Sequence, residues 1–448
     1  MTEREFAIEV VKRLREAGHV AFWAGGCVRD ERLGLAPKDY DVATDALPEE
    51  VRGLFRRTVS VGMSFGVVQV LGPRAPEGPM KVEVATFRSD GRYSDGRHPD
   101  SVVFASARED ALRRDFTING MFYDPIEEKL IDYVGGETDL EARVLRAIGD
   151  PVARFREDKL RLLRAVRIAT RFDLELEAAT AAAIPALAPQ IKEISAERIA
   201  EELRKLLVYR QRARGVALME QTGLVAAILP ELLEMKGLPQ GPPHAPTGDL
   251  WEHVLLVLDL LGDAPSFPLA FAALFHDVGK RRTVGRTPDR YTFYSHEEVS
   301  RRMAFEAAIR LKLSTVERDR IEWLVKKHQF LADARQMRTS KLKMTLAHAG
   351  IRELLALHRA DAVASGRSAD HVDYCEQLLS EWSDADLNPE PFVNGHDLGR
   401  LGLTPGPKYK EILDKVREAQ LDGALQSRAQ ALEFVQKLVA EASPPPNS

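Results

Sequence analysis

Cysteine is scarce in this chain. Its 448 residues include two cysteines, Cys27 and Cys375, which are far apart and lack the spacing of a metal-binding motif. This argues against a disulfide framework and is typical of a reducing compartment. Long apolar runs are missing too: none approaches the roughly 20 residues of a membrane span, and the opening segment is charged and helix-periodic rather than an apolar signal. We therefore expect a cytoplasmic protein without a membrane partner.

The chain also has no excess of positive charge. It carries 63 Lys and Arg residues against 68 Asp and Glu, for a net charge of -5. Nucleic-acid binding would therefore need a local basic patch rather than an overall field. Hydrophobic residues at 44% and charged residues at 29% are ordinary for a globular protein. The length predicts two to four domains, and neither a repeat nor any sign of oligomeric state is present.

The sequence pattern changes near residue 150. Before it, one helix and several short runs with β propensity alternate with Gly/Pro clusters. After it, apolar residues recur almost throughout at the helical period. We expect an α/β head, with a mixed sheet and helices, followed by a long all-α body. The expected divisions are a head at 1–150, a helical neck at 151–238, a helical domain at 250–365 and a helical tail at 366–448.

Two aspartates near the amino end suggest a metal site. Asp39 and Asp41 are two residues apart in a run with β propensity, so their carboxylates are expected on one face of a strand. They would repel each other without a cation between them, and carboxylate oxygens suit Mg²⁺, which often also binds substrate phosphates. Upstream, Gly25 and Gly26 would let backbone N–H groups approach a phosphate, and Arg29 could bind a phosphate oxygen. Each fragment alone is equally typical of a surface turn, but together they indicate a nucleoside triphosphate held over metal ions.

Three long motifs carry a resemblance to a known family: "GGCVRD…KDYDVAT", "VEVATFRSDGRYSDGRHPDSVVF" and "RRDFTINGMFYDP". From about residue 25 to at least 207, the chain resembles the bacterial-type (class II) tRNA nucleotidyltransferase and poly(A) polymerase family, whose head is polymerase-β-like. The resemblance implies that the two aspartates hold catalytic Mg²⁺. It also implies triphosphate contacts from Gly25, Gly26 and Arg29.

The motif "RRDFTING" has two interpretations. From composition alone, Arg113 and Arg114 would be a solvated basic face and Asp115 a helix cap. The resemblance instead makes Arg114 a triphosphate ligand, and Asp115 and Asn119 nucleotide contacts, with Asp115 at the ribose. Gly120 stands where the family usually has alanine, which is a minor departure.

Two further features lie between these motifs. Alternation in "KVEVATFR" places Glu83 on the face opposite Val82 and Val84. Glu83 is then either a third carboxylate of the site, orienting a neighbour or binding metal, or the partner of an arginine. The polar run "SDGRYSDGRHP" is predicted to be a loop. In the family the corresponding loop helps to close the site, which suggests roles for Asp95 and Arg97.

The stretch "REDKLRLLRAVRIATRF" suggests how a base could be chosen. On a single helix, Asp158 and Arg161 would face the same side, and the simplest interpretation is an ion pair. A carboxylate beside a guanidinium also matches the amino group and ring nitrogen of cytosine or adenine. Uracil or guanine would leave the carboxylate unpaired, at a cost of about 1–3 kcal/mol. The spacing resembles the family's nucleotide-selecting motif, and we group Arg164 and Arg167 with the nucleotide-binding residues.

The second half contains "WEHVLLVLD", "LFHDVGK", "YSHEEVS", "KKHQF" and "HRAD". These segments resemble the HD-type metal-dependent phosphohydrolase family. A lone buried histidine is more often a core residue, but the ordered set favours a metal site, and mixed imidazole and carboxylate ligands suit Mn, Ni, Fe or Zn. His296 and His328 are placed for a second ion or a phosphate. The ligands implied by the resemblance are His253, His276, Asp277 and Asp361.

The leading hypothesis is an Mg²⁺-dependent nucleotidyltransferase that adds CMP and AMP, from CTP and ATP, to the tRNA 3′ end without a template. The alternatives are a poly(A) polymerase of the same family and an enzyme that adds only CC or only A. From another class comes an HD-type phosphohydrolase with a nucleotide-binding head. A non-catalytic RNA-binding module fits the composition least, and RNA contact by the tail, as in the family, has weak support from its equal acidic and basic content.

Overall fold

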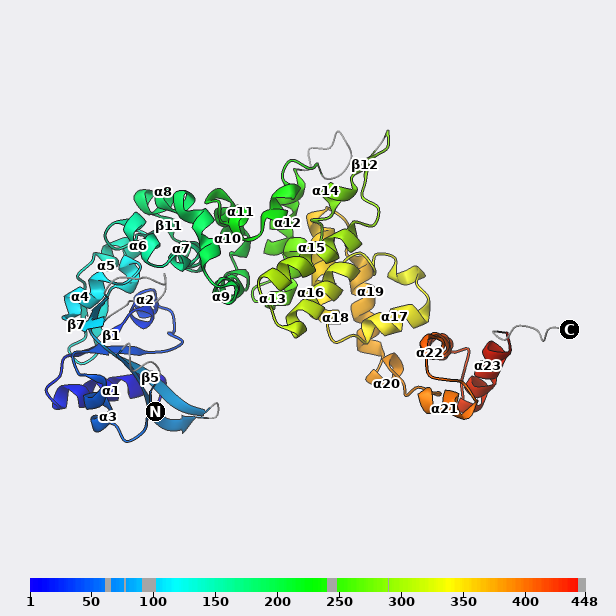
Figure 1. The fold of residues 1–448 in the computed structure, drawn as a ribbon, viewed down its shortest axis with the longest axis horizontal. Helices are drawn as coiled ribbons and strands as arrows, with labels where there is room; N and C mark the ends of the chain where they lie inside the picture. Colours follow the sequence, from blue (N-terminus) through cyan, green and yellow to red (C-terminus); the bar gives the residue numbers. More distant parts are fainter. Residues whose placement is uncertain (61–65, 76–77, 91–101, 240–247, 289, 442–448) are drawn as a thin grey trace. The chain divides into compact units, whose positions relative to one another are not determined.

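The computed structural model divides the chain into two compact units, Met1–Pro230 and Glu231–Ser448 (Figure 1). Strands of a mixed sheet occur in the first unit and the second is almost entirely helical, which confirms the expected fold class. The finer division into head, neck, helical domain and tail stays a prediction. None of the described helices is long and apolar enough to cross a membrane. The structure describes residues 1–60, 66–75, 78–90, 102–239, 248–288 and 290–441.

One mixed sheet forms the centre of the head, in the strand order β3-β4-β5-β2-β1-β8-β9. β2 and β5 are parallel, and the other neighbouring pairs are antiparallel. A parallel pair beside antiparallel hairpins is a mixed topology, as expected. The strands are β1 (Ala21–Ala24), β2 (Asp41–Thr44), β3 (Thr58–Ser60), β4 (Val67–Ala75), β5 (Gly78–Thr86), β8 (Phe122–Asp124) and β9 (Lys129–Ile131).

The predicted alternation in β5 is confirmed. Val82 and Val84 are buried, whereas Glu83 is exposed on the other face. In the register of the sheet, Glu83 lies directly beside Asp41 of β2. Asp39 lies just before β2 rather than in it, so the expectation that both aspartates belong to one strand is wrong for Asp39.

Helix α1 (Glu3–Glu16) covers one face of this sheet (Figure 1). A capping box starts it: the Glu5 backbone N–H donates to Thr2 Oγ1 over 3.1 Å, and the Thr2 N–H donates to Glu5 Oε2 over 2.7 Å. Its apolar residues recur every three or four positions and bury one stripe. The remaining head elements are α2 (Gly26–Arg32), α3 (Pro48–Leu54), β6 (Arg88–Asp90), β7 (Val102–Phe104), α4 (Ala107–Leu112), η2 (Thr117–Asn119), α5 (Gly136–Glu141) and β10 (Val144–Leu145).

The expected helix across "REDKLRLLRAVRIATRF" is interrupted. Helix α6 (Pro151–Glu157) ends before Asp158, which has extended backbone angles, and α7 begins at Leu160. The break turns Asp158 out of the helical series, so the prediction that Asp158 and Arg161 share one helix is wrong. The other elements of this region are α7 (Leu160–Phe172), β11 (Glu175–Leu176), α8 (Ala178–Leu187), η3 (Ala188–Glu193), α9 (Ala196–Leu207), α10 (Arg212–Gln221) and α11 (Leu224–Ile228).

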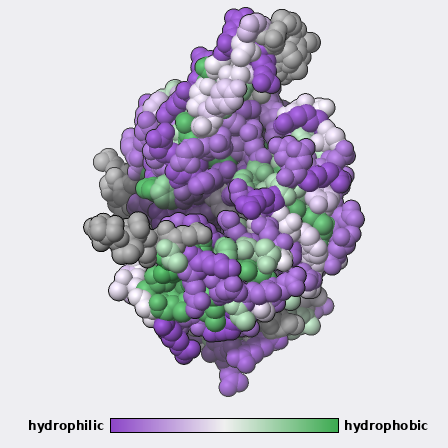
Figure 2. All heavy atoms as spheres, turned by 90° about the vertical axis from the view of Figure 1, so that its right-hand side faces the viewer, coloured by the Kyte–Doolittle hydropathy of each residue, from purple (hydrophilic) through white to green (hydrophobic). Residues whose placement is uncertain are grey.

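The second unit packs helices around buried apolar side chains, with a separate small core in its last helices around Leu398 and Val435. The face of the molecule that Figure 2 shows is mostly hydrophilic, with scattered hydrophobic areas. The unit contains α12 (Leu250–Asp259), α13 (Phe267–Phe275), α14 (Lys280–Thr283), β12 (Gly285–Arg286), β13 (Tyr291–Thr292), α15 (His296–Arg310), α16 (Thr315–Lys327), η5 (Ala334–Gln336), α17 (Thr339–Leu346), α18 (Ile351–Ala364), α19 (Asp370–Glu381), α20 (Asp384–Leu387), α21 (Gly395–Arg400), α22 (Pro407–Leu421) and α23 (Arg428–Glu441); η4 (Pro230–Met235) spans the division between the units.

Candidate nucleotide site and metal centre

The turn from β1 into α2 requires glycine. Gly25 has φ 74° and ψ −125°, a conformation that other residues rarely adopt. A Cβ atom at Gly25 would lie 3.0 Å from Nη1 of Arg114. The absence of a side chain therefore lets the Arg114 guanidinium lie close to the backbone of this turn, as a shared anion site would require.

Carboxylates gather beside this turn. Burial, with the negative charges of Asp39 and Glu83, raises the pKa of Asp41 to about 7, and the positive charge of Arg114 offsets part of the rise. Glu83 forms no ion pair with another described residue. The structure thus favours Glu83 as a third carboxylate over the partner of an arginine. Three carboxylates facing one guanidinium fit a divalent cation, because their mutual repulsion falls when one binds.

Arg114 is half-buried rather than part of a solvated basic face. Its Nη2 lies 2.9 Å from Oδ2 of Asp110, and its guanidinium lies over the Phe122 ring at 5.2 Å. Arg113 pairs with the other carboxylate oxygen of Asp110 at 2.6 Å. One buried aspartate therefore orients both arginines of the "RRDFTING" motif.

Asn119 connects the predicted phosphate and ribose contacts. Its Oδ1 accepts a hydrogen bond from Nη1 of Arg29, and its Nδ2 donates to Oδ1 of Asp115 over 3.0 Å. The buried Arg29 also donates to Oδ1 of Asp30 over 2.6 and 2.8 Å. Burial lowers the pKa of Arg29, and the charge of Asp30 opposes that shift. A triphosphate at Arg29 would therefore share the guanidinium with Asp30 and Asn119.

Asp115 is buried and contacts helix α7. Nη2 of Arg164 lies 2.8 Å from its Oδ2. Burial alone would raise the pKa of Asp115, but the charge of Arg164 and the hydrogen bond from Asn119 outweigh it and lower the pKa. Asp115 is thus an ionised acceptor whose position is set from both η2 and α7.

The structure does not pair Asp158 with Arg161. Asp158 accepts from the Leu160 N–H over 3.0 Å and from Nη2 of Arg198 over 2.8 Å. Nη1 of Arg161 instead donates to Oε2 of Glu157 over 2.6 Å. Both predicted base-reading side chains are buried and held by other partners. Arg167 in turn donates to Glu202 of α9, and Asp95 and Arg97 lie outside the described residues.

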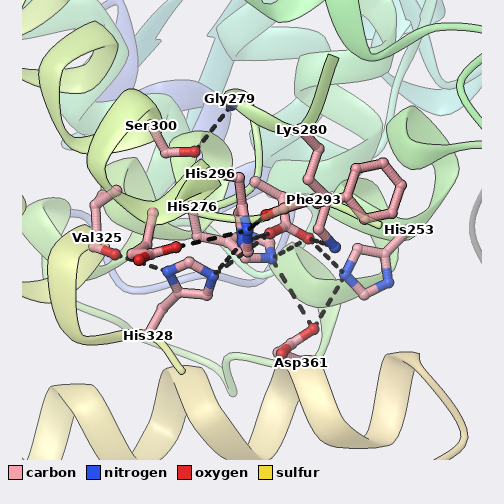
Figure 3. Close-up of polar contacts among 12 residues, drawn as sticks. His253, His276, Gly279, Lys280, Phe293, His296, Ser300, Val325, His328 and Asp361 are labelled. Atoms are coloured by element: carbon pink, nitrogen blue, oxygen red, sulfur yellow. Dashed lines mark hydrogen bonds and ion pairs between the residues drawn. The ribbon is translucent and has the colours of Figure 1, made fainter. Parts of the chain in front are cut away.

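In the second unit, the predicted histidines and aspartates lie together (Figure 3). Nε2 of His253 lies 3.2 Å from Oδ1 of Asp361, and Nε2 of His276 lies 3.3 Å from Oδ2 of Asp277. The other oxygen, Oδ1 of Asp277, lies 3.1 Å from Nε2 of His296 and 3.4 Å from Nε2 of His328. Asp277 therefore belongs to two ligand groups, one through each oxygen. The groups are His253, His276, Asp277 and Asp361, and Asp277, His296 and His328.

Backbone carbonyls fix the ring orientation of three histidines. Nδ1 of His276 lies 2.7 Å from the Ala273 carbonyl oxygen; for His296 and His328 the equivalent distances to the carbonyls three residues earlier are 2.8 and 2.7 Å. A carbonyl only accepts, so Nδ1 carries the proton and Nε2 keeps its lone pair. This is the arrangement of metal-ligating histidines.

Unsatisfied buried atoms support a metal centre here. Nε2 of His253, Nε2 of His276 and Oδ1 of Asp277 are buried without a hydrogen-bond partner. A buried polar atom without a partner is costly. A cation in the first ligand group would satisfy the two histidine nitrogens, and one in the second group would satisfy Oδ1 of Asp277. The donor set fits a divalent metal of the Mn, Ni, Fe or Zn type.

Two cations flank this centre. Nζ of Lys280 lies 2.6 Å from Oδ2 of Asp277, and Nη2 of Arg367 donates to Oδ2 of Asp361 over 3.1 Å. Burial opposes the shift, yet the charge of Lys280 holds the pKa of Asp277 well below its usual value. Asp277 is therefore ionised and available as a ligand.

Sequence reasoning missed several residues that hold these sites. Asp30, Arg198 and Glu202 meet their partners Arg171, Asp158 and Arg167 across the fold and carry no local pattern. Arg367 donates to Asp361, six positions earlier. Lys280 alone had a signal, because it follows the His-Asp pair in "LFHDVGK". Long-range ion pairs of this kind depend on tertiary packing.

Family models match three segments. Residues 21–146 match the Poly A polymerase head domain, residues 173–236 match the probable RNA and SrmB-binding site of polymerase A, and residues 250–366 match the HD domain. These segments contain the carboxylate cluster, the region after α7, and the complete histidine and aspartate set, respectively.

Curated relatives carry two names. The CCA-adding enzyme of Geobacillus thermodenitrificans (strain NG80-2) is 42% identical over 229 residues, which is 51% of this chain and 55% of that protein. Poly(A) polymerase I of Haemophilus influenzae (strain ATCC 51907 / DSM 11121 / KW20 / Rd) is 38% identical over 239 residues, which is 50% of this chain and 51% of that protein. The chain spans about half the length of the curated relatives it matches.

Solved structures extend the similarity along the chain. The crystal structure of the Bacillus stearothermophilus CCA-adding enzyme in complex with CTP matches with a TM-score of 0.73 at 27% identity, covering 99% of this chain and 100% of that one. The Thermotoga maritima CCA-adding enzyme complexed with tRNA shares the fold, with a TM-score of 0.57 at 20% identity over 97% of this chain and 95% of that one. The head motifs, the three domain matches and these relatives agree, and the chain therefore belongs to the bacterial-type tRNA nucleotidyltransferase and poly(A) polymerase family and carries an HD domain.

Proposed function

We propose that this protein adds CMP and AMP, from CTP and ATP, to the 3′ end of tRNA in an Mg²⁺-dependent reaction without a nucleic-acid template. One observation carries the proposal: Asp39, Asp41 and Glu83 cluster beside the Gly25 turn, with Arg114 as their neighbouring cation. The relatives named CCA-adding enzymes support the choice of tRNA, and the scarcity of cysteine supports a cytoplasmic location.

The chain's own residues divide the work of phosphoryl transfer. Asp39 and Asp41 would hold Mg²⁺, which when bound supplies positive charge for the triphosphate and the attacking hydroxyl. Arg114, oriented by Asp110, binds a phosphate oxygen near the Gly25 turn. The 3′ hydroxyl of the RNA then attacks the α-phosphate, and pyrophosphate leaves.

Asp158 and Arg161 select the base in this proposal. Both are buried, and a carboxylate oxygen accepts more than one hydrogen bond, so Asp158 can accept from a base amino group while it holds Arg198. The Glu157 carboxylate fixes Arg161 as donor to the ring nitrogen. A base with a carbonyl in place of the amino group would face the Asp158 carboxylate without a donor, which costs about 1–3 kcal/mol.

One experiment separates CCA addition from its alternatives. The protein is incubated with tRNA ending at the discriminator base, at C and at CC, and with unstructured RNA, and each labelled nucleotide is offered singly. Addition of C, C and then A, with no further growth, is expected for tRNA alone. Long A tracts on any RNA would identify a poly(A) polymerase, and growth that stops after CC, or only after a CC end, would identify the partial activities. Asp41→Asn is the inactive control, because it keeps the side-chain shape and removes the charge.

A second activity has its own observation. The unsatisfied buried nitrogens of His253 and His276 beside Asp277 favour a metal-dependent phosphohydrolase in the HD domain. We infer hydrolysis of phosphate esters, with His253, His276, Asp277 and Asp361 as ligands of a transition metal. Metal-dependent release of phosphate from 2′-phosphate or cyclic phosphate substrates is expected, and it should be lost in His276→Ala/Asp277→Ala. Full activity in that double variant would exclude this centre.

A further inference from the structure

A basic segment links the two ligand groups of the HD domain. It leaves the centre after Asp277, forms α14 and the β12–β13 hairpin, and returns at His296. Residues 280–294 hold five basic residues and a single acidic residue, Asp289, in a chain whose net charge is -5. The basic residues are Lys280, Arg281, Arg282, Arg286 and Arg290.

The hairpin has a defined geometry. Gly285 pairs with Thr292 and Arg286 with Tyr291, and the Thr287 N–H donates to the Arg290 carbonyl over 2.8 Å. A Cβ atom at Gly285 would lie 2.6 Å from Oγ1 of Thr292, so a larger residue here would force the Thr292 side chain to move. The hairpin projects from the helices of its unit in Figure 1.

Three arginines in and beside the hairpin make no ion pair with a described residue. Arg281, Arg286 and Arg290 are exposed, and none of them forms an ion pair with a residue that the structure describes. Arg282, by contrast, makes a double hydrogen bond to Glu234. Tyr294 is 76% exposed, and the Arg286 guanidinium lies 5.9 Å from the centre of the Tyr291 ring. Arginines without such an ion pair, beside the half-buried Tyr291 and the exposed Tyr294, favour a polyanion with stacking bases.

The base of the hairpin is continuous with the metal centre (Figure 3). Nζ of Lys280 lies 2.6 Å from Oδ2 of Asp277 and 5.3 Å from the centre of the Phe293 ring. The Phe293 carbonyl in turn accepts from Nδ1 of His296. A nucleic-acid strand bound by the hairpin would therefore have its end near both ligand groups.

We propose that the β12–β13 hairpin, with Arg281 and Tyr294, binds single-stranded RNA and presents its phosphorylated end to the HD centre. The arginines pair with backbone phosphates and Tyr294 stacks on a base. The presentation of the end deepens the proposed phosphohydrolase function and rests on it, whereas the binding of the strand does not. The substrate class is then an RNA end carrying a terminal phosphate rather than a free nucleotide.

Crosslinking tests the surface directly. A single-stranded RNA of about ten nucleotides, with a 3′ phosphate and a photoreactive base near that end, is irradiated with the full chain, and the modified peptides are mapped. We expect modification within residues 281–294, lost in Arg286→Glu/Arg290→Glu and reduced severalfold in Tyr294→Ala. Arg352→Glu reverses the charge of another exposed arginine, on α18, and should leave the modification unchanged. Crosslinks confined to residues 1–230 would overturn the proposal, as would displacement of the RNA by an acidic peptide at equal concentration.

Hydrolysis distinguishes the two proposals. With the Mn²⁺-loaded protein, the hairpin double variant should raise KM for the 3′-phosphorylated RNA by about tenfold or more and lower the salt dependence of binding, since two phosphate contacts are removed. Its kcat and KM for a small chromogenic phosphate monoester should stay as in the wild type. Equal KM values for the RNA would overturn the hairpin proposal alone. If neither substrate is hydrolysed, the phosphohydrolase proposal and end presentation fail, and the crosslink decides strand binding.

Discussion

At the residue scale, Asp41 couples metal binding to pH. Its pKa in the folded, metal-free protein is about 7, above its ordinary value of 3.8, because burial and two neighbouring carboxylates oppose its charge. Between about pH 4 and 7, the folded state keeps a proton on Asp41 that the unfolded state has lost. The stability of the metal-free protein therefore falls as pH rises through that window. A divalent cation needs the ionised form, so protons compete with it below pH 7.

We therefore expect the head to bind Mg²⁺ about tenfold more weakly at pH 6 than at pH 8, since Asp41 is mostly protonated at the lower pH. Thermal unfolding over an Mg²⁺ titration at each pH measures the change. The Asp41→Asn variant should lose the stabilisation of the head by Mg²⁺ and keep the stabilisation of the HD domain by metal. Equal Mg²⁺ affinities of the wild type at the two pH values would contradict the proposal that Asp41 is an Mg²⁺ ligand with a raised pKa.

Lys280 plays the opposite role in the HD centre. Its ammonium forms an ion pair with Oδ2 of Asp277, the oxygen that also faces His276. It therefore stabilises the carboxylate in the metal-free protein and competes with a metal ion for that oxygen. Lys280→Met should destabilise the metal-free protein by about 3 kcal/mol or more, because a buried charge loses its partner. The same variant should bind Mn²⁺ more tightly, by about tenfold, since one competing cation is gone.

Calorimetric unfolding without metal and Mn²⁺ titration of the same sample measure the two effects of Lys280→Met. Arg281→Met is the matched control, because that neighbour is exposed and without an ion pair to a described residue. An unchanged or weaker Mn²⁺ affinity in Lys280→Met would show that the ammonium does not compete.

At the scale of elements, local sequence patterns predicted the strand alternation correctly but could not predict the contacts between distant residues. Alternation placed Glu83 and its buried neighbours correctly, because a strand's period is short and local. The prediction of a continuous helix across Asp158 was wrong, since a break at Asp158 and Lys159 leaves no mark in a helical hydrophobic pattern. Arg198 reaches Asp158 across 40 positions, and no spacing rule connects them. The motifs thus identified the candidate site residues, while their partners required the fold.

Helices α2 and α7 meet through one buried aspartate. Asp30 binds Arg29 through Oδ1, and its Oδ2 lies 3.3 Å from Nη2 of Arg171 on α7. The helix with Arg29, the proposed phosphate ligand, is therefore coupled to the helix that carries Arg161, one of the proposed base-selecting residues. In a double-mutant cycle of Asp30→Asn and Arg171→Met, we expect a coupling free energy of about 1 kcal/mol, reduced by the partial exposure of Arg171.

Denaturant unfolding of the four proteins in this cycle measures the coupling, and each single variant should also raise KM for CTP, because Arg29 loses part of its orientation. The surface pair Glu201 and Arg204 of α9 serves as the control, with an expected coupling of a few tenths of a kcal/mol. Additive effects of Asp30→Asn and Arg171→Met, with an unchanged KM, would refute the coupling.

At the scale of the whole molecule, the chain consists of two units, each with its own candidate metal site. The carboxylate cluster lies in Met1–Pro230, and both ligand groups of the HD domain lie in Glu231–Ser448. Each unit also has its own buried cluster, around Phe122 in the first and Leu398 in the second. Separate cores with separate ligands favour two cooperative unfolding transitions rather than one.

Metal ions should therefore move these transitions independently. Mn²⁺ at saturating concentration raises the midpoint of any transition whose folded state binds it, and a ligand variant removes the rise only in its own unit. In calorimetry, His276→Ala/Asp277→Ala should abolish the shift of one transition and leave the other as in the wild type, and Asp41→Asn should do the reverse. When all three changes are combined, their effects on stability should add to within about 0.5 kcal/mol, because the sites share no partner. A single transition that responds to both sets of variants would instead show that the two units unfold as one cooperative body.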